Sequence, residues 1–156
     1  MTRPTADELR RLGALPARID CARVRLHRAP SPLRSLVLWA SRGRAVTLGN
    51  HIFLPDRCAG DLAVLAHELT HCGQYQRWGA PRYFARGAAA QLRELLFRWF
   101  GLGRSPYAYR LEDGKPFEAY GMEQQGQIVE DSFRGDVQAL AVSPYRPGIG
   151  QETPSA

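Results

Sequence analysis

The segment from Leu62 to Gln76 constrains the fold more than any other. It has the pattern of a buried helix, and it also contains ionisable side chains. Its apolar residues recur at helical spacing: Leu62, Leu65, Ala66, Leu69 and Cys72. Asp56 or Asp61 supplies the N-cap, and the helix is expected to end near Gln76 or Trp78, before Gly79. Such a helix has to be buried against other elements, so the chain is expected to form a packed domain.

The motif His67-Glu68-Leu69-Thr70-His71 lies inside this helix and has the H-E-x-x-H pattern. Residues four apart project from the same helix face, so His67 and His71 can offer two imidazole nitrogens to one Zn²⁺ ion. Glu68 is rotated by about 100° from His67. It therefore misses the metal but can take a proton from a metal-bound water as a general base.

A catalytic zinc needs a third protein ligand and one open position. The remaining histidines, His27 and His51, precede the motif, whereas several carboxylates follow it. We expect Glu123 to be the third ligand because it begins a predicted helix, with Glu118 as the alternative.

The predicted helix that contains Glu123 also carries residues expected to support the metal site. Glu123, Gln127 and Glu130 share one of its faces. Gly126 is small enough to allow close packing against the motif helix. Gln127 is expected to hydrogen-bond a ligand histidine.

The rest of the pattern predicts an α+β domain with a small N-terminal sheet packed on the motif helix. A capping box from Thr5 to Glu8 begins a short helix. Further predicted elements are a strand at 18–28, a helix or strand at 33–40, two short strands or one bulged strand at 45–54, a helix at 82–100, a structured loop at 104–117, and a helix from Pro116 or Met122 to Phe133. The apolar residues of 88–100 favour core packing, with a membrane-surface helix as the alternative, and the three tryptophans are expected to be packing residues.

Length and composition exclude several classes of protein. The chain has 156 residues, enough for one domain at 1–144 followed by a flexible tail at 145–156. No run of about 18 apolar residues is present, so no membrane span is expected. The N-terminus has no secretory signal pattern, which favours cytoplasmic residence at synthesis or export without a cleaved signal peptide. Three cysteines without a C-x-x-C pair argue against a disulfide framework.

The net charge of +6 comes almost entirely from arginine, and Lys115 is the one lysine. The arginines are spread along the chain without a tight basic run, so nucleic-acid binding is not expected. Contact with an acidic surface remains compatible with this charge.

These motifs resemble the gluzincin group of zinc metallopeptidases, which have H-E-x-x-H and a glutamate on a later helix. A closer resemblance, over residues 45–133, is to bacterial domains of contractile injection and type VI secretion machinery. These are the injection-system core domain and metallopeptidase domains attached to spike or Rhs-type proteins. The matching stretches are Thr47–Phe53, Leu65–His71 with Gln74–Gln76, and Tyr120–Asp131.

The resemblance implies a zincin-like fold, His67, His71 and Glu123 as zinc ligands, and Glu68 as the base. The chain departs from the gluzincin pattern at Gly126, where gluzincins often have alanine. The spacing between His71 and Glu123 is also longer than in compact gluzincins. No histidine follows the motif to stabilise an oxyanion, so the candidates for that role are Tyr107, Tyr109, Arg110 and Arg134.

The function expected from these features is zinc-dependent hydrolysis of a peptide bond by a secretion-associated effector, such as a toxin. Its partners would be a protein or peptide substrate and a secretion-machinery or immunity protein. The alternative is a zinc-binding but non-catalytic assembly or docking module of a secretion apparatus. A further alternative is an interaction protein in which H-E-x-x-H is a chance occurrence.

Overall fold

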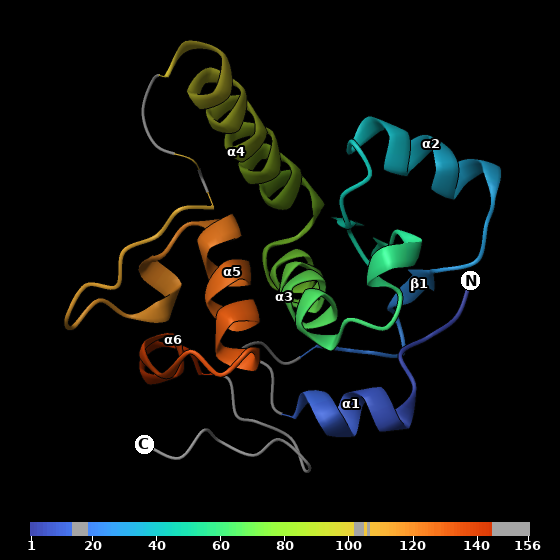
Figure 1. Ribbon diagram of the computed structural model, residues 1–156, viewed down its shortest axis with the longest axis horizontal. Coiled ribbons are helices and arrows are strands. Elements are labelled where there is room, and N and C mark those ends of the chain that lie inside the picture. Colours follow the sequence, from blue (N-terminus) through green and yellow to red (C-terminus); the bar gives the residue numbers. More distant parts are fainter. Residues whose placement is uncertain (14–18, 102–104, 106, 145–156) are drawn as a thin grey trace.

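The computed structural model describes residues 1–13, 19–101, 105 and 107–144, and every structural statement below concerns these residues. They form a single small α+β domain, which confirms the predicted fold class (Figure 1). Its helices and strands are α1 (Ala6–Leu12), β1 (Arg25–His27), α2 (Pro32–Ala40), β2 (Val46–Leu48), β3 (His51–Phe53), α3 (Leu62–Trp78), α4 (Ala80–Phe100), α5 (Met122–Phe133) and α6 (Val137–Val142), with 3-10 turns at Asp56–Cys58 and Phe117–Ala119.

The small sheet lies against α3 and has the strand order β1-β3-β2. Strand β1 runs parallel to β3, and β2 runs antiparallel to it, with Thr47 opposite Ile52. The segment 45–54 is therefore a hairpin of two strands. Its turn contains Gly49 at φ 68°, a left-handed conformation that glycine adopts without steric cost.

Two predictions for the N-terminal region need correction or completion. The predicted strand at 18–28 is only Arg25–His27, because Asp20 starts a turn instead. Its side chain accepts a hydrogen bond from the Ala22 amide, and its carbonyl accepts one from Arg23. The undecided segment 33–40 is helix α2, which Ser31 caps and Pro32 begins.

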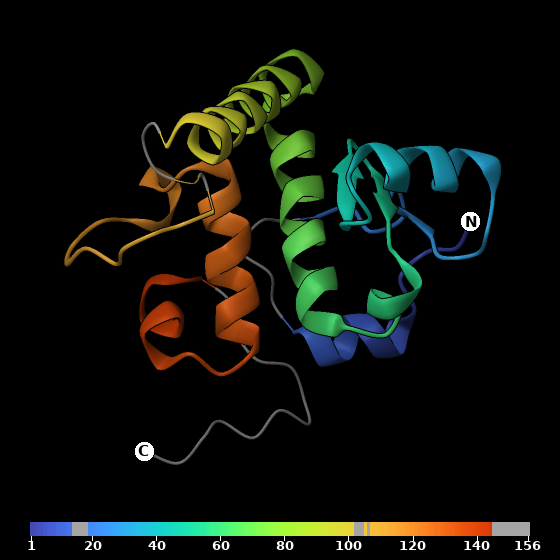
Figure 2. The ribbon, with the colours of Figure 1, turned by 45° about the horizontal axis from the view of Figure 1, so that its top comes forward.

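Helices α3 and α5 pack side by side across the middle of the domain (Figure 2). Asp61 caps α3 by accepting from the amides of Ala63 and Val64, and Gly79 ends the helix at φ 77°. The capping box at Thr5 is present in α1 as predicted. The core between the helices and the sheet consists largely of aliphatic side chains that are fully buried: Leu12, Val24, Leu26, Ile52, Leu54, Leu65, Leu69, Ile128 and Val129.

Helix α6 was not predicted, and its N-cap explains why it forms. Asp136 accepts hydrogen bonds from the amides of Gln138 and Ala139 at the start of a six-residue helix. Ala139 is buried in the core. Such a short helix has too few turns for its apolar periodicity to stand out in the sequence.

Helix α4 begins at Ala80, with Pro81 in its first turn, and projects away from the body of the domain (Figure 1). The expectation that its apolar residues form core is wrong, since Tyr83 and Ala90 alone are buried among its residues. Two of the three tryptophans expected to be packing residues are also exposed, since Trp39 is 79% exposed and Trp99 is 67% exposed.

The remaining expectations are partly tested. Cys21, Cys58 and Cys72 all have free thiols. Among the described helices none is both long and apolar enough to cross a bilayer. Most of the predicted loop between α4 and α5 is described, but residues 102–104 and 106 lie outside the described part, as does the predicted tail at 145–156.

Candidate metal centre

The structure brings His67, His71 and Glu123 together, although Glu123 is far from the histidines in the sequence. One donor atom from each lies within 4.8 Å of the others, and all three residues are buried. The two histidine Nε2 atoms are 3.1 Å apart, and Glu123 Oε2 is 3.4 Å from that of His71 and 3.9 Å from that of His67. Two imidazoles and a carboxylate are a donor set that suits Zn²⁺ with a fourth position left for water or substrate.

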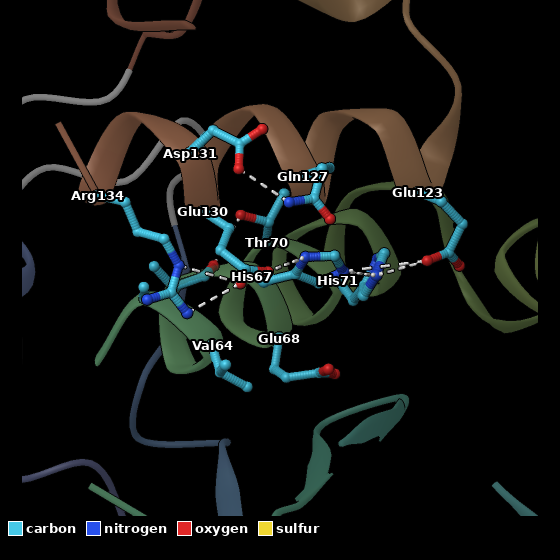
Figure 3. Close-up of polar contacts among 12 residues, drawn as sticks. Val64, His67, Glu68, Thr70, His71, Glu123, Gln127, Glu130, Asp131 and Arg134 are labelled. Atoms are coloured by element: carbon cyan, nitrogen blue, oxygen red, sulfur yellow. Dashed lines mark hydrogen bonds and ion pairs between the residues drawn. The ribbon is translucent and has the colours of Figure 1, made fainter. Parts of the chain in front are cut away.

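The outer ring nitrogens of both histidines are held by other side chains, as Figure 3 shows for His67. His67 Nδ1 lies 3.1 Å from Glu130 Oε2, and His71 Nδ1 lies 2.8 Å from Gln74 Oε1. Gln74 in turn donates to Gln125 Oε1 at 3.0 Å. These contacts place the Nδ1 proton outwards and turn each Nε2 towards Glu123, the orientation that a metal ligand requires.

The charges of the cluster shift its pKa values in opposite directions. Burial by itself lowers the pKa of His71, but the Glu123 carboxylate outweighs this effect and raises that pKa to about 9. Burial by itself raises the pKa of Glu123, and His71 outweighs it, so the pKa of this carboxyl lies below its usual value. The protonated His71 imidazole and the Glu123 carboxylate therefore stabilise each other, and a divalent cation bound by both would have to displace this proton.

Glu130 belongs to a second layer of charge behind His67. The hydrogen bond with His67, against the effect of burial, lowers the pKa of Glu130. Arg134 donates to Glu130 Oε1 at 3.1 Å (Figure 3). It also donates to Asp61 Oδ2 at 3.0 Å, which links the start of α3 to the end of α5.

Glu68 points away from α5, towards the β2–β3 hairpin (Figure 3). The Thr47 hydroxyl donates to Glu68 Oε2 at 2.7 Å, and the Tyr83 hydroxyl donates to the Thr47 carbonyl at 2.9 Å. Glu68 is buried but borders the same cleft as the three clustered side chains. Its carboxylate is therefore not part of the cluster.

The close approach of α5 to α3 depends on Gly126. A Cβ atom at this position would lie 2.7 Å from Nε2 of His67, closer than real Cβ contacts come. The absence of a side chain at Gly126 thus lets the two helices meet at the donor cluster.

Other candidates from the sequence lie elsewhere. Glu118 is exposed in the 3-10 turn before α5 and does not join the cluster. Gln127 is not the hydrogen-bond partner of either histidine Nδ1, and its amide donates to Asp131 Oδ1 at 2.9 Å. His27 and His51 contact each other across β1 and β3 at 3.0 Å.

The cluster lies at a cleft of about 1130 Å³ whose walls come from α2, β2, α3, α4 and α5. Of the four residues considered for oxyanion stabilisation, Tyr107 borders this cleft. Burial and the nearby charge of Glu123 raise the pKa of Tyr107. Tyr109 donates to Asp131, Arg134 pairs with Glu130 and Asp61, and Arg110 is exposed outside the cleft lining.

Sequence reasoning missed three residues that hold the site. Glu130 shares a face with Glu123, which was noted, but its contact with His67 was not. Gln74 follows His71 by three residues, a spacing that puts the two side chains on one face of α3 and was a readable signal. Thr47 carried no signal, because its contact with Glu68 joins a strand to a helix.

Comparison with known proteins places the chain in a biological context. Residues 10–79 match the family model described as the eCIS core domain. This match contains the sheet and α3 with both motif histidines, and it ends before Glu123.

A second similarity is to the type VI secretion system spike protein VgrG2b of Pseudomonas aeruginosa. The two are 33% identical over 107 residues, which cover 62% of this chain and 10% of the spike protein. The matched part is thus about a tenth of that protein's length. No solved structure gives a significant match. The chain therefore contains a domain related to those of contractile injection and type VI secretion systems.

Proposed function

We propose that the chain is a zinc-dependent peptidase associated with a secretion or contractile injection system. The observation that carries this proposal is the convergence of His67, His71 and Glu123, with one donor atom from each within 4.8 Å of the others. In this proposal these three side chains hold Zn²⁺, and Glu68 is the general base. Bound zinc would supply Lewis acidity towards a peptide carbonyl and acidity to a bound water.

The residues around the cluster fit roles in such a reaction. Glu68 would take a proton at its carboxylate and later donate it to the leaving amine, and the Thr47 hydroxyl holds that carboxylate in one orientation. Tyr107 is the residue best placed to donate a hydrogen bond to a developing oxyanion, since it borders the cleft close enough to Glu123 for that charge to affect its pKa. Glu130 and Gln74 would keep the imidazoles oriented.

The test compares the wild-type chain with Glu68→Gln, both purified without added metal. We expect elemental mass spectrometry to find about one zinc per chain in each, as for three-ligand sites. Hydrolysis of an unfolded protein such as casein should fall by a factor of about 10² to 10⁴ in the variant. Full hydrolysis by a zinc-loaded Glu68→Gln protein would contradict the assigned base, and a wild type that takes up no zinc would contradict the whole proposal.

A second candidate is a zinc-binding assembly or docking module without catalytic activity. The comparisons support it more directly than they support a peptidase, because the matched names are those of a core domain and a spike protein. Neither name mentions an enzyme. In this case removal of zinc would lower the melting temperature, as for a structural metal, while no peptide or protein would be cleaved by the zinc-loaded wild type.

The proposal also covers how the chain would leave the producing cell and which proteins it would meet. A chain associated with such a system would leave the producing cell without a cleaved signal peptide, and would meet secretion machinery or an immunity protein. If it is a peptidase, its substrate would be a protein of a target cell. Pull-down experiments with the wild type and Glu68→Gln would separate the two kinds of partner, since a substrate is retained better by the inactive variant.

A further inference from the structure

The second half of α4 is an apolar surface that the domain leaves exposed. From Gln91 to Phe100 every residue is exposed except Glu94. Six large apolar side chains in this stretch have exposed fractions between 37% and 67% and are here called the α4 end patch: Leu92, Leu95, Leu96, Phe97, Trp99 and Phe100. Soluble domains rarely expose so many neighbouring apolar groups without a partner.

The cleft accounts for only part of the α4 end patch. Leu92, Leu95 and Trp99 border the cleft, so a ligand there would cover them. Leu96, Phe97 and Phe100 are not among the described residues that line it. An occupant of the cleft would therefore leave these three side chains exposed to water.

The exposed charges on α4 are all positive. Arg93 and Arg98 lie within the patch, and Arg82 and Arg86 lie on the preceding turns. Glu94 is the one acidic residue of the helix, and it is turned inwards, where the Ser105 hydroxyl donates to it at 2.8 Å. The surface therefore combines Trp, Phe and Leu with arginine, the composition of helices that lie in a membrane interface.

We propose that the α4 end patch docks the domain on an anionic lipid surface, with the helix lying in the plane of the interface. Aromatic and leucine side chains would enter the boundary between headgroups and acyl chains, and the arginines would meet anionic headgroups. Helix α4 contains too few apolar residues to cross the bilayer, and no described helix is long and apolar enough to do so. This docking does not depend on a metal in the candidate centre.

Sedimentation with vesicles tests the proposal on the full chain. The probes are vesicles of phosphatidylcholine with 30% phosphatidylglycerol, and vesicles of phosphatidylcholine alone. We expect the wild type to bind the anionic vesicles at least about tenfold more strongly, because each arginine near such a surface contributes about fivefold. Binding should weaken as salt is raised, since salt screens exposed charges.

Two double variants locate the surface. Leu96→Gln with Phe100→Gln keeps helix propensity and leaves the cleft lining unchanged, and should lower vesicle binding by at least about tenfold. Arg93→Gln with Arg98→Gln should lower it by about 25-fold, which is fivefold for each arginine. The matched charge control is Arg10→Gln with Arg11→Gln, which removes the same charge from α1 at the far end of the domain (Figure 1). The matched apolar control is Trp39→Gln on α2, where the one arginine of the helix is buried.

The vesicle-binding results of the variants and controls decide whether the α4 end patch is the docking surface. Loss of binding in the two α4 variants, with both controls unchanged and melting temperatures equal to that of the wild type, supports the proposal. Equal binding to neutral vesicles, or equal losses in the controls, overturns it. Failure to bind vesicles also overturns it, and if the wild type sediments as a dimer that Leu96→Gln with Phe100→Gln dissociates, the patch is a contact between two copies instead.

Discussion

Gly126 and His67 meet so closely that the pair sets the distance between α5 and α3. The space that a Cβ atom at 126 would need is already occupied by the His67 imidazole, with Nε2 only 2.7 Å away. The same nitrogen is a member of the donor cluster with His71 and Glu123. Helix packing and the candidate metal centre therefore depend on the same missing side chain.

Gly126→Ala should disturb both stability and metal binding. The added methyl group has to displace His67 or push α5 outwards, which we expect to lower the free energy of unfolding by about 1–3 kcal/mol. The control is Gly87→Ala on α4, where an added Cβ meets nothing within 4 Å and should raise stability by up to about 1 kcal/mol. Thermal melts and zinc titrations measure both effects, and a Gly126→Ala protein with wild-type zinc affinity would show that the helices can separate at no cost.

Substitution of Glu123 and of Glu118 should affect the zinc content differently. Glu123 lies in the first turn of α5, and Glu118 lies in the 3-10 turn before it. Glu123→Gln removes the carboxylate from the cluster and should leave well below one zinc per chain after dialysis against a weak chelator. Glu118→Gln changes an exposed side chain and should retain the wild-type zinc content. Elemental mass spectrometry decides between them, and zinc loss in the Glu118 variant would reassign the third ligand.

Glu130→Gln should weaken zinc binding without removing a ligand. The carboxylate accepts from His67 at Nδ1 and so makes Nε2 a better donor, and loss of such a partner lowers metal affinity by about 10- to 100-fold. Competition with a fluorescent zinc chelator measures this change. Gln127→Ala on the same helix is the control, because Gln127 hydrogen-bonds to Asp131 and the partners of the histidine Nδ1 atoms are Glu130 and Gln74.

Thr47→Val should lower hydrolysis but not zinc content. Valine keeps the shape of threonine but cannot donate to Glu68, so the carboxylate is less well oriented, and we expect kcat to fall by about tenfold, on the order of one charge-assisted hydrogen bond. Thr70→Val is the matched control, since the Thr70 hydroxyl donates within its own helix to the Ala66 carbonyl. An equal fall in both variants would indicate general loosening of α3 instead of a role for Thr47.

The stability of the metal-free protein should fall as the pH rises above neutrality. The pKa of His71 is raised from 6.5 to about 9 in the folded protein, so its contribution is complete below 6.5 and disappears as the pH rises through about 9. The pKa of Glu123 is lowered from 4.5, so its contribution is present above 4.5 and disappears as the pH falls through the lowered value. The contribution of the His71–Glu123 pair to the melting temperature of chelator-treated protein should therefore be largest at about pH 5 to 6.5.

Bound zinc should oppose the loss of stability that the metal-free protein shows as the pH rises. A proton has to leave the His71–Glu123 pair before both can bind an ion, so zinc affinity should increase with pH up to about 9. Glu123→Gln should remove most of the alkaline fall in the metal-free melting temperature. A fall that is unchanged in this variant would place its origin outside the cluster.

The sequence by itself determined the local features of the fold and of the site. The apolar stripe with H-E-x-x-H predicted α3, the shared face of His67 and His71 and the different direction of Glu68, because the helix fixes the relative directions of side chains. The capping box at Thr5 predicted α1 for the same local reason. Glu123 was proposed from its place at the start of a helix and from a family resemblance, and not from any contact.

Tertiary structure decided the features that depend on residues far apart in the chain. The partners of the histidines, the hydrogen bond from Thr47 to Glu68 and the place of Tyr107 at the cleft all follow from how helices and strands pack. The exposure of α4 belongs to the same group. Its apolar pattern is that of a core helix, and only the position of the surrounding elements shows that its second half extends beyond them. A periodic pattern indicates which face of a helix is apolar, but burial depends on whether another element reaches that face.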